Sequence, residues 1–222
     1  MGRLLEILGR RRRAMTIIPA AHPAGDVYRL MTAIIVPRPI AFVSSLSRDG
    51  VRNLAPFSFF TAVSANPPVI CFAPMIRGRD GTRKDTLNNI EATGEFVVNI
   101  VSEAIARPMN ECSAEVPPEV DEFALSGLTP RPSERVAPPR VAESGACMEC
   151  RLLQVVHVSA QPLGGSLVLG EVLLFHVDDP LFHNFSVDPA ALGAIARMGG
   201  ATYARTTDRF EMPRPGPVGR RG

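Results

Sequence analysis

The chain has 222 residues, 45% of them hydrophobic and 21% charged, so it can bury a core and is not expected to be disordered throughout. Its formal net charge of +2 hides an uneven distribution: residues 1–13 carry about +4 and residues 205–222 about +3, which leaves about −5 for the body. A negative body excludes a broad basic face for nucleic acid, and no apolar run approaches the ~20 residues needed to cross a bilayer.

Both ends of the chain differ in composition from the body. The basic residues 1–13 precede only a short apolar stretch that Pro19 interrupts, which does not fit a signal peptide, and Met15 is as natural a start as Met1. We therefore expect a disordered basic extension at residues 1–22, one domain at residues 23–213, and a disordered tail at residues 214–222, where Pro, Gly and Arg dominate.

Residues 37–60 form the most informative stretch, after a lead-in segment at residues 26–36. Residues 40–46 predict an apolar strand, and Asp49-Gly50 supplies the positive φ angles of a short hairpin turn. The strand that follows carries small polar residues where a purely structural hairpin carries apolar ones. Pro56 is expected to interrupt its ladder, so that neighbouring amides can face a ligand.

The next segment predicts an anion site. Residues 61–66 are expected to form a turn, residues 69–73 a short buried strand, and residues 74–84 a polar loop that ends at Lys84, the sole lysine of the chain. A helix follows, capped by Asp85 or Thr86. A cationic loop beside free amides at a helix N-terminus attracts phosphate; a capped surface helix with solvated arginines is the structural alternative.

The second half predicts antiparallel strands. Residues 96–101 are uniformly apolar, which favours a central strand, and a helix at residues 103–112 comes next. The proline-rich residues 115–140 predict an extended surface excursion that serves as a functional loop or a dimer contact. Residues 147–160 and 167–177 predict a long hairpin, and the absence of a GxGxxG turn after any strand argues against a Rossmann domain. A short helix is expected within residues 189–197.

Four cysteines in a chain of this length do not indicate a disulfide scaffold. Cys147 and Cys150 form a CxxC pair, but no second pair completes a zinc site. We expect free thiols in a reducing cytoplasm and no bound metal.

Four stretches carry a family resemblance. The runs are RNLAPFSFF at residues 52–60, RKDTLNNIEATGEFVVNI at 83–100, the strand pair at 149–179, and ARMGGATYAR at 196–205. Together they resemble the flavin reductase-like family of FMN-binding split barrels, to which flavoredoxins are related. The resemblance implies a mainly β fold: a six-stranded antiparallel Greek-key split β-barrel with peripheral helices, which binds FMN and forms a homodimer.

The resemblance also implies roles for individual residues. One group would contact the flavin ring and ribityl chain, a second the phosphate, and a third would close over the ring or a nicotinamide. His176, which ends a strand beside two aspartates, is the one candidate for a catalytic group, and a hydrogen-bonded structural histidine is the alternative reading of that residue. The first group is Asn53, Leu54, Ala55, Ser58, Phe59, Ser44 and Ser45. The second group is Lys84, Asp85 and Thr86, and the third is Arg197 and Tyr203. Ser44 and Ser45 are assigned to the ribityl or phosphate end, and Asp85 to capping the helix rather than to contacting the phosphate.

The implied activity is hydride transfer from NADH or NADPH to flavin, with small-molecule substrates and, as a recipient of reduced flavin, a flavin-dependent monooxygenase. An electron carrier or oxidase of the flavoredoxin type and a non-catalytic flavin-binding protein stay open as alternatives. The choice of nucleotide, the final electron acceptor, and whether FMN is a prosthetic group or a substrate are also open.

Overall fold

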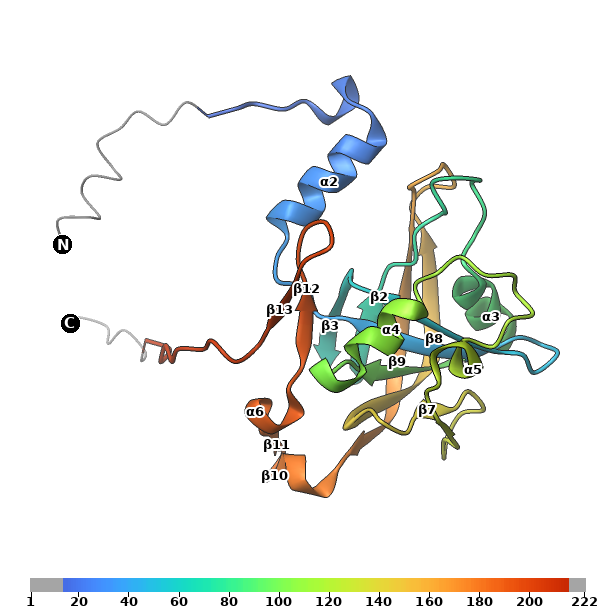
Figure 1. Cartoon of the computed structure of the whole chain (residues 1–222), viewed down its shortest axis with the longest axis vertical. Helices are drawn as coiled ribbons and strands as arrows, with labels where there is room; N and C mark the ends of the chain where they lie inside the picture. The colour runs from blue at the N-terminus through green and yellow to red at the C-terminus, as the bar shows by residue number, and fades with distance from the viewer. Residues whose placement is uncertain (1–13, 216–222) are drawn as a thin grey trace.

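Tight turns join the apolar segments of the sequence into antiparallel strands. The computed structural model describes residues 14–215, in which one large curved sheet is surrounded by short helices (Figure 1). Disorder is predicted for residues 1–22 and 214–222; residues 1–13 and 216–222 of these stretches lie outside the described residues, whereas Pro19–Ala21 form the short 3-10 helix η1. Between residues 14 and 215, no helix is long and apolar enough to cross a membrane.

The main sheet has seven strands in the order β2-β1-β5-β8-β9-β4-β3, and every neighbouring pair is antiparallel. The strands are β1 (Ala41–Leu46), β2 (Arg52–Phe57), β3 (Phe60–Ala65), β4 (Pro68–Phe72), β5 (Glu95–Ile100), β8 (Ala146–His157) and β9 (Ser166–Val177). Because β4 lies beside β9 while the chain continues from β4 to β5, the connection is of the Greek-key kind.

The mainly β split-barrel fold is confirmed, but the predicted count of six strands is one too low. The missing strand is β3, which lies where a turn was expected at residues 61–66. Most of its side chains are exposed, and Val63 lies at a bulge in its pairing with β4. An exposed edge strand of small residues lacks the apolar alternation by which strands are recognised.

The two edges of the sheet approach each other, which makes the sheet a split barrel. β2 and β3 are at opposite ends of the strand order, yet only Ser58 and Phe59 separate them in the chain. Three consecutive Cα steps span at most about 11 Å. The sheet must therefore curl until its edges nearly meet at this corner, although no ladder closes it.

The helices and short strand pairs lie around this barrel. The helices are η1 (Pro19–Ala21), α2 (Ala24–Ile34), α3 (Asp85–Thr93), η2 (Glu103–Ile105), α4 (Ala106–Glu111), α5 (Glu122–Ser126), η3 (Asp179–Leu181) and α6 (Pro189–Leu192). The short pairs are β6 (Pro130–Arg131) with β7 (Arg140–Val141), β10 (Phe182–His183) with β11 (Ser186–Val187), and β12 (Ile195–Arg197) with β13 (Tyr203–Arg205).

Two apolar clusters explain why β1 begins with apolar residues at successive positions. Ala41 and Val43 belong to the cluster inside the barrel, whereas Phe42 belongs to a second cluster under α4 and α5. A strand that is covered on both faces needs apolar side chains at successive positions. This arrangement fixes β1 as an interior strand, with β2 outside it at the sheet edge.

The proline-rich segment is not the surface excursion expected from its composition. It contains α5, and its Glu122, Phe123, Leu128 and Val136 are buried. Phe123 and Leu128 pack in the cluster under α4 and α5. The error arose because prolines exclude ladder hydrogen bonds but do not prevent the residues between them from packing against a sheet.

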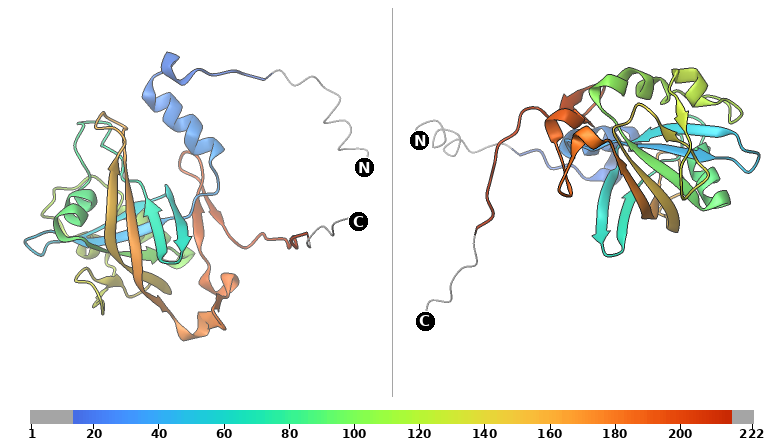
Figure 2. Two further views of the ribbon diagram at one scale, coloured as in Figure 1. Left: turned by 180° about the vertical axis from the view of Figure 1, so that it is seen from behind. Right: turned by 90° about the horizontal axis from the view of Figure 1, so that it is seen from below.

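Helix α2 and the hairpin β12–β13 stand side by side at one end of the barrel, as both figures of the whole chain show (Figures 1 and 2). The buried Arg38 connects them: its guanidinium donates to the carbonyls of Thr32 and Ile35 at 2.6 Å each and to that of Met198 at 2.9 Å. Helix α2 and the hairpin β12–β13 are thereby held together next to the β2–β3 corner.

All four cysteines are free and buried, as predicted. Burial raises the pKa of Cys147 to about 11 and that of Cys112 to about 11. No cluster of metal-ligating side chains is found within residues 14–215.

Candidate functional site

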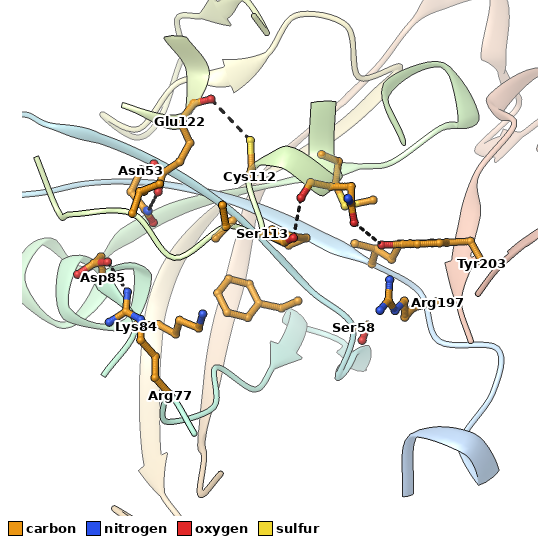
Figure 3. Close-up of a pocket in the computed structure, with 18 of the residues that line it drawn as sticks. Asn53, Ser58, Arg77, Lys84, Asp85, Cys112, Ser113, Glu122, Arg197 and Tyr203 are labelled. Carbon is orange, nitrogen blue, oxygen red and sulfur yellow. Dashed lines mark hydrogen bonds and ion pairs between the residues drawn. The ribbon is translucent and has the colours of Figure 1, made fainter. Parts of the chain in front are cut away.

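A cavity of about 290 Å³ lies against the edge strand β2. Its walls come from β2, the loop before α3, the end of α4 and the segment after it, α5, and the hairpin β12–β13 (Figure 3). The lining residues are Tyr28, Ile40, Asn53, Ala55, Pro56, Phe57, Ser58, Arg77, Lys84, Asp85, Met109, Asn110, Cys112, Ser113, Ala114, Val116, Glu122, Arg197 and Tyr203.

Strand β2 forms one wall because its outer edge has no strand partner. The amide of Leu54 points away from β1 and donates to Glu122 Oε2 at 3.0 Å. Pro56 lies two residues further along the same edge, in continuous register with Phe42. The proline therefore does not interrupt the ladder, contrary to the prediction; it occupies a position that faces away from β1 and gives up no hydrogen bond.

Asn53 is the centre of a buried hydrogen-bond network that fixes this wall to α3 and α5. Its Nδ2 donates to Glu122 Oε1 at 2.9 Å, and its Oδ1 accepts from Thr86 Oγ1 at 2.6 Å and from Ser45 Oγ at 3.2 Å. Asn89 Nδ2 in turn donates to Ser45 Oγ at 3.2 Å. Such fully satisfied networks hold a site in a single arrangement.

Burial raises the pKa of Glu122, although its hydrogen bonds from Leu54 and Asn53 oppose that shift. Glu122 is only 5% exposed, and its carboxylate has no cationic partner within 4 Å among the described residues. Both carboxylate oxygens accept hydrogen bonds from β2, and these bonds offset part of the cost of burying the negative charge.

The N-terminus of α3 opens into the same cavity. Lys84 is its N-cap residue, and no side chain caps the helix. The prediction that Asp85 or Thr86 would cap it is therefore wrong: the Asp85 carboxylate accepts from Arg77 at 2.7 Å, and the Thr86 hydroxyl donates to Asn53. Within residues 14–215, the amides of Asp85 and Thr86 have no hydrogen-bond acceptor, which leaves two donors available.

Lys84 points into the cavity at this end (Figure 3). Burial and the nearby Arg77 lower its pKa, and the carboxylates of Glu115 and Asp85 only partly oppose this. In the described part of the chain, its ammonium has no carboxylate within 4 Å and no hydrogen-bond acceptor. A half-buried, unpaired cation beside free helix amides forms a site for an anion.

The opposite end of the cavity is lined by Arg197, Tyr203 and Ser58 (Figure 3). Asn110 also lines the cavity, beside Tyr203. The Arg197 guanidinium lies 4.5 Å from the centre of the Tyr203 ring and donates to the carbonyl of Gly200 at 2.6 Å. Tyr203 Oη donates to Asn110 Oδ1 at 3.3 Å, which ties the hairpin to α4.

Most of the predicted site residues lie together. Seven of them line the cavity, and Thr86 is one hydrogen bond away from it through Asn53. The seven are Asn53, Ala55, Ser58, Lys84, Asp85, Arg197 and Tyr203.

Four other predicted residues do not line the cavity. Ser44 and Ser45 are fully buried on β1; Ser44 donates to the carbonyl of Pro139 on the far side of the strand. The side chain of Leu54 packs in the cluster under α4 and α5. Phe59 lies at the β2–β3 corner, where its ring packs edge-on against Tyr28 at 6.4 Å and lies 5.9 Å from the Arg38 guanidinium.

His176 was expected near the opening of the site, and that prediction is wrong. It lies on β9, paired with Cys147, and its Nε2 contacts the buried Glu149 at 2.6 Å. The same carboxylate accepts hydrogen bonds from the amides of Glu134 and Arg135, so the group anchors the proline-rich segment to the barrel. His176 therefore takes part in contacts that hold the fold together, and it does not line the cavity.

The sequence alone did not reveal Glu122, Arg77, Asn110 and Tyr28 as lining residues. Glu122 contacts residues 68 and 69 positions away in the chain, and no local pattern reports such a contact. Arg77 could have been found, because it belongs to the cationic loop that was assigned to an anion.

Comparison with known proteins agrees with this geometry. The sequence pattern described as flavin reductase like domain matches residues 31–194. A protein of Aquifex aeolicus, itself uncharacterized, is 42% identical over 183 residues, which is 82% of this chain and 91% of the relative.

Two solved structures are similar over nearly the whole chain. Nitrilotriacetate monooxygenase component B from Bacillus cereus has a TM-score of 0.86 and 36% identity, covering 90% of this chain and 100% of the other. The 2-nitrobenzoate 2-nitroreductase of Pseudomonas fluorescens has a TM-score of 0.78 and 31% identity, covering 94% and 100%. With the matched pattern and the split barrel, these similarities identify the chain as a member of the flavin reductase-like domain family, a family of flavin-binding proteins.

Proposed function

We propose that the protein is an FMN-dependent oxidoreductase that accepts a hydride from NADH or NADPH. The observation that carries the proposal is the anion site at one end of the cavity, where the unpaired Lys84 ammonium and the free amides of Asp85 and Thr86 converge. FMN differs from riboflavin by one phosphate, so a flavin-binding cavity with a built anion site is suited to FMN.

The donors at this end fit a phosphate monoester. Lys84 would supply a charge, and the amides of Asp85 and Thr86 would supply two oriented donors at the positive end of the α3 dipole. The hydroxyl of Thr86 is already used in donating to Asn53, so its amide is the contact we assign to the phosphate. Asp85 stays neutralised by Arg77 rather than repelling the anion.

The middle of the cavity fits a flat ring. Ala55 and Pro56 present short side chains along β2, and Asn53 and Ser58 place polar atoms at either end of that strand segment. We assign the isoalloxazine to this wall. Ser58 Oγ accepts from Arg38 Nε at 3.3 Å, which positions the hydroxyl for a further contact.

Bound FMN would supply the hydride-accepting chemistry, and the chain would bind, orient and shield it. Both acidic side chains that line the cavity are engaged: Asp85 with Arg77, and Glu122 with Leu54 and Asn53. Neither is free to act as a general acid or base. A site that positions a ring and whose two carboxylates are both engaged is suited to hydride transfer between two bound ring systems.

We propose that reduced flavin or its electrons pass to a second protein, such as a flavin-dependent monooxygenase. The support is the similarity to a protein that is itself a monooxygenase component. Steady-state kinetics with both nucleotides separate the possibilities, because a bound cofactor that passes electrons on gives parallel patterns, whereas reduction of a visiting flavin gives intersecting ones.

We also propose a homodimer. Met31 and Ile34 of helix α2 and Ile35, the residue after it, are between 45% and 68% exposed and form an apolar face next to the cavity residue Tyr28. A second copy would cover this face. Sedimentation of the wild type and of Ile34→Glu tests this, because the charged variant should shift toward the monomer, and a wild type that sediments as a monomer at all concentrations would refute it.

Two measurements test the main proposal. FMN and riboflavin are each titrated into the purified protein, and binding is followed by flavin fluorescence; FMN should bind at least tenfold more tightly. The FMN-loaded protein is then mixed with NADH or NADPH under anaerobic conditions, and bleaching of the flavin absorbance is expected. Equal affinity for FMN and riboflavin would contradict the assignment of the phosphate, and a loaded protein that neither nucleotide bleaches would contradict the hydride transfer.

A further inference from the structure

The cavity has a second positive end that the flavin phosphate does not need. Arg38 and Arg197 face each other across a short antiparallel bridge, in which the Arg38 amide donates to the Arg197 carbonyl at 3.0 Å and the Arg197 amide donates back at 2.8 Å. Like charges placed directly opposite each other across a strand pair are destabilising. The pairing of Arg38 with Arg197 is therefore expected to cost folding free energy.

No carboxylate offsets that cost. Between residues 14 and 215, neither arginine has an Asp or Glu oxygen within 4 Å, whereas the next arginine of the hairpin, Arg205, is paired with Glu103. Arg38 satisfies its guanidinium with three carbonyls and the Ser58 hydroxyl, and it is only 4% exposed. The charge on Arg38 is thus hydrogen-bonded but not neutralised.

Arg197 is the member of this pair that can reach a ligand. It lines the cavity beside Tyr203 (Figure 3) and is partly exposed. The Tyr203 ring and the Gly200 carbonyl hold its guanidinium in place. One of its terminal nitrogens donates to Gly200, and no side chain accepts from the guanidinium among the described residues. A guanidinium held in a fixed orientation, with donors left over, binds carboxylate and phosphate oxygens.

This inference rests on the proposed function, because it takes the Lys84 end as the place of the FMN phosphate. FMN carries one phosphate, and Arg197 lies at the other end of the cavity from Lys84 (Figure 3). We propose that Arg197 binds an anionic group of the second substrate, the molecule that exchanges electrons with the flavin. The same chemistry is offered by the pyrophosphate of a reduced nicotinamide dinucleotide and by the carboxylate of an aromatic acid.

The test compares charged and neutral forms of each ligand in FMN-loaded wild type and Arg197→Gln. NADH is compared with N-benzyl-dihydronicotinamide, a hydride donor without phosphates, and benzoate is compared with benzamide as a binding probe. Losing one charge-assisted contact should weaken kcat/KM for NADH, or the affinity for benzoate, by roughly 10- to 100-fold and leave the neutral counterpart nearly unchanged. A loss confined to NADH identifies the dinucleotide, and a loss confined to benzoate identifies an aromatic acid.

Arg197→Lys, which keeps the charge, should recover part of the loss. Arg205→Gln is the matched control, because it removes a positive charge from the same hairpin without lining the cavity. Equal losses for charged and neutral ligands, or no loss for any of them, would overturn the proposal. So would a lowered midpoint potential of the bound flavin in Arg197→Gln without discrimination between the ligands, because Arg197 would then act on the flavin itself.

Failure of the proposed function is recognised separately. Binding of ADP-ribose, which cannot donate a hydride, is measured by calorimetry in the same variants. If no donor bleaches the wild-type flavin, the hydride transfer is refuted, yet weaker binding of ADP-ribose or benzoate to Arg197→Gln would still support the anion contact.

Discussion

Replacing Lys84 with methionine is the most direct test of the flavin phosphate site. The substitution keeps an unbranched apolar stem of similar length and removes the charge. Lys84 is the cation at this end of the cavity with no carboxylate within 4 Å in the described chain, whereas Arg77 is paired with Asp85 at 2.7 Å. The charge removed is therefore one that is available to a ligand.

The expected loss follows from a single charge-assisted contact. Such a contact contributes about 1.5–3 kcal/mol, which corresponds to an FMN dissociation constant raised roughly 10- to 150-fold. The two free amides at the start of α3 remain, so binding is weakened rather than abolished. Riboflavin, which lacks the phosphate, should bind the variant and the wild type equally well.

The pH dependence gives an independent check. Burial lowers the pKa of Lys84, so the ammonium loses its proton at a lower pH than the ordinary value of 10.5. FMN affinity should fall as the pH rises through that lowered pKa, and this fall should be absent from Lys84→Met. In the unliganded protein the sign is opposite: stability should rise with pH between the lowered pKa and 10.5, because the folded state binds fewer protons there than the unfolded state.

Fluorescence titration with FMN and riboflavin at several pH values measures these quantities. Arg83→Met is the matched control, since it removes the neighbouring charge, which is paired with Glu91 and does not line the cavity. If Lys84→Met lost equal affinity for FMN and riboflavin, or if Arg83→Met lost as much FMN affinity, the phosphate would not lie at Lys84 and the reasoning would fail.

Three further predictions concern the scaffold. Gly170→Ala should destabilise the fold by about 1–3 kcal/mol in urea unfolding, because the added Cβ would lie 2.3 Å from the Phe96 ring, whereas Gly25→Ala, with nothing within 4 Å, should not destabilise it. Glu122→Gln should remove the loss of stability that occurs as the pH rises from 4.5 through the raised pKa of Glu122; an unchanged pH profile would show that this carboxyl is not the group responsible. Thr86→Val should cost about 1 kcal/mol of stability through the lost bond to Asn53 and leave FMN affinity nearly unchanged; a large loss of affinity would reassign the hydroxyl to the phosphate.

Local signals in the sequence were sufficient for the hairpins and for the helix beside the anion site. Gly50 adopts φ +82° in the turn between β1 and β2, and Gly94 adopts φ +78° at the end of α3, where glycine is favoured over side chains with a Cβ. Lys84 was singled out as the sole lysine, and it lies where the anion site was expected. In these turns and at this helix start, the groups that interact are close together in the sequence.

The failures concern contacts between distant segments. Ser44 and Ser45 were placed on the correct strand, but β1 is covered on both faces, so neither side chain reaches the cavity. His176 was placed at the end of the correct strand, yet the position of that strand within the barrel is not encoded locally. Glu122 was expected at the surface because its neighbours include many prolines, whereas its carboxylate is buried and accepts a hydrogen bond from the open edge of β2.

The proposed binding of anions must be reconciled with the negative charge of the body of the chain. The body carries about −5 once the basic ends are set aside, so long-range attraction does not bring an anion to it. An anion must instead bind where a positive side chain has no carboxylate partner. The cavity has two such places: Lys84 at one end, and Arg197 next to Arg38 at the other. A ligand with a single negative group can satisfy only one end at a time. The arrangement is therefore suited to two molecules that each bring an anion to an opposite end and meet between them, as a flavin and its electron-exchange partner must.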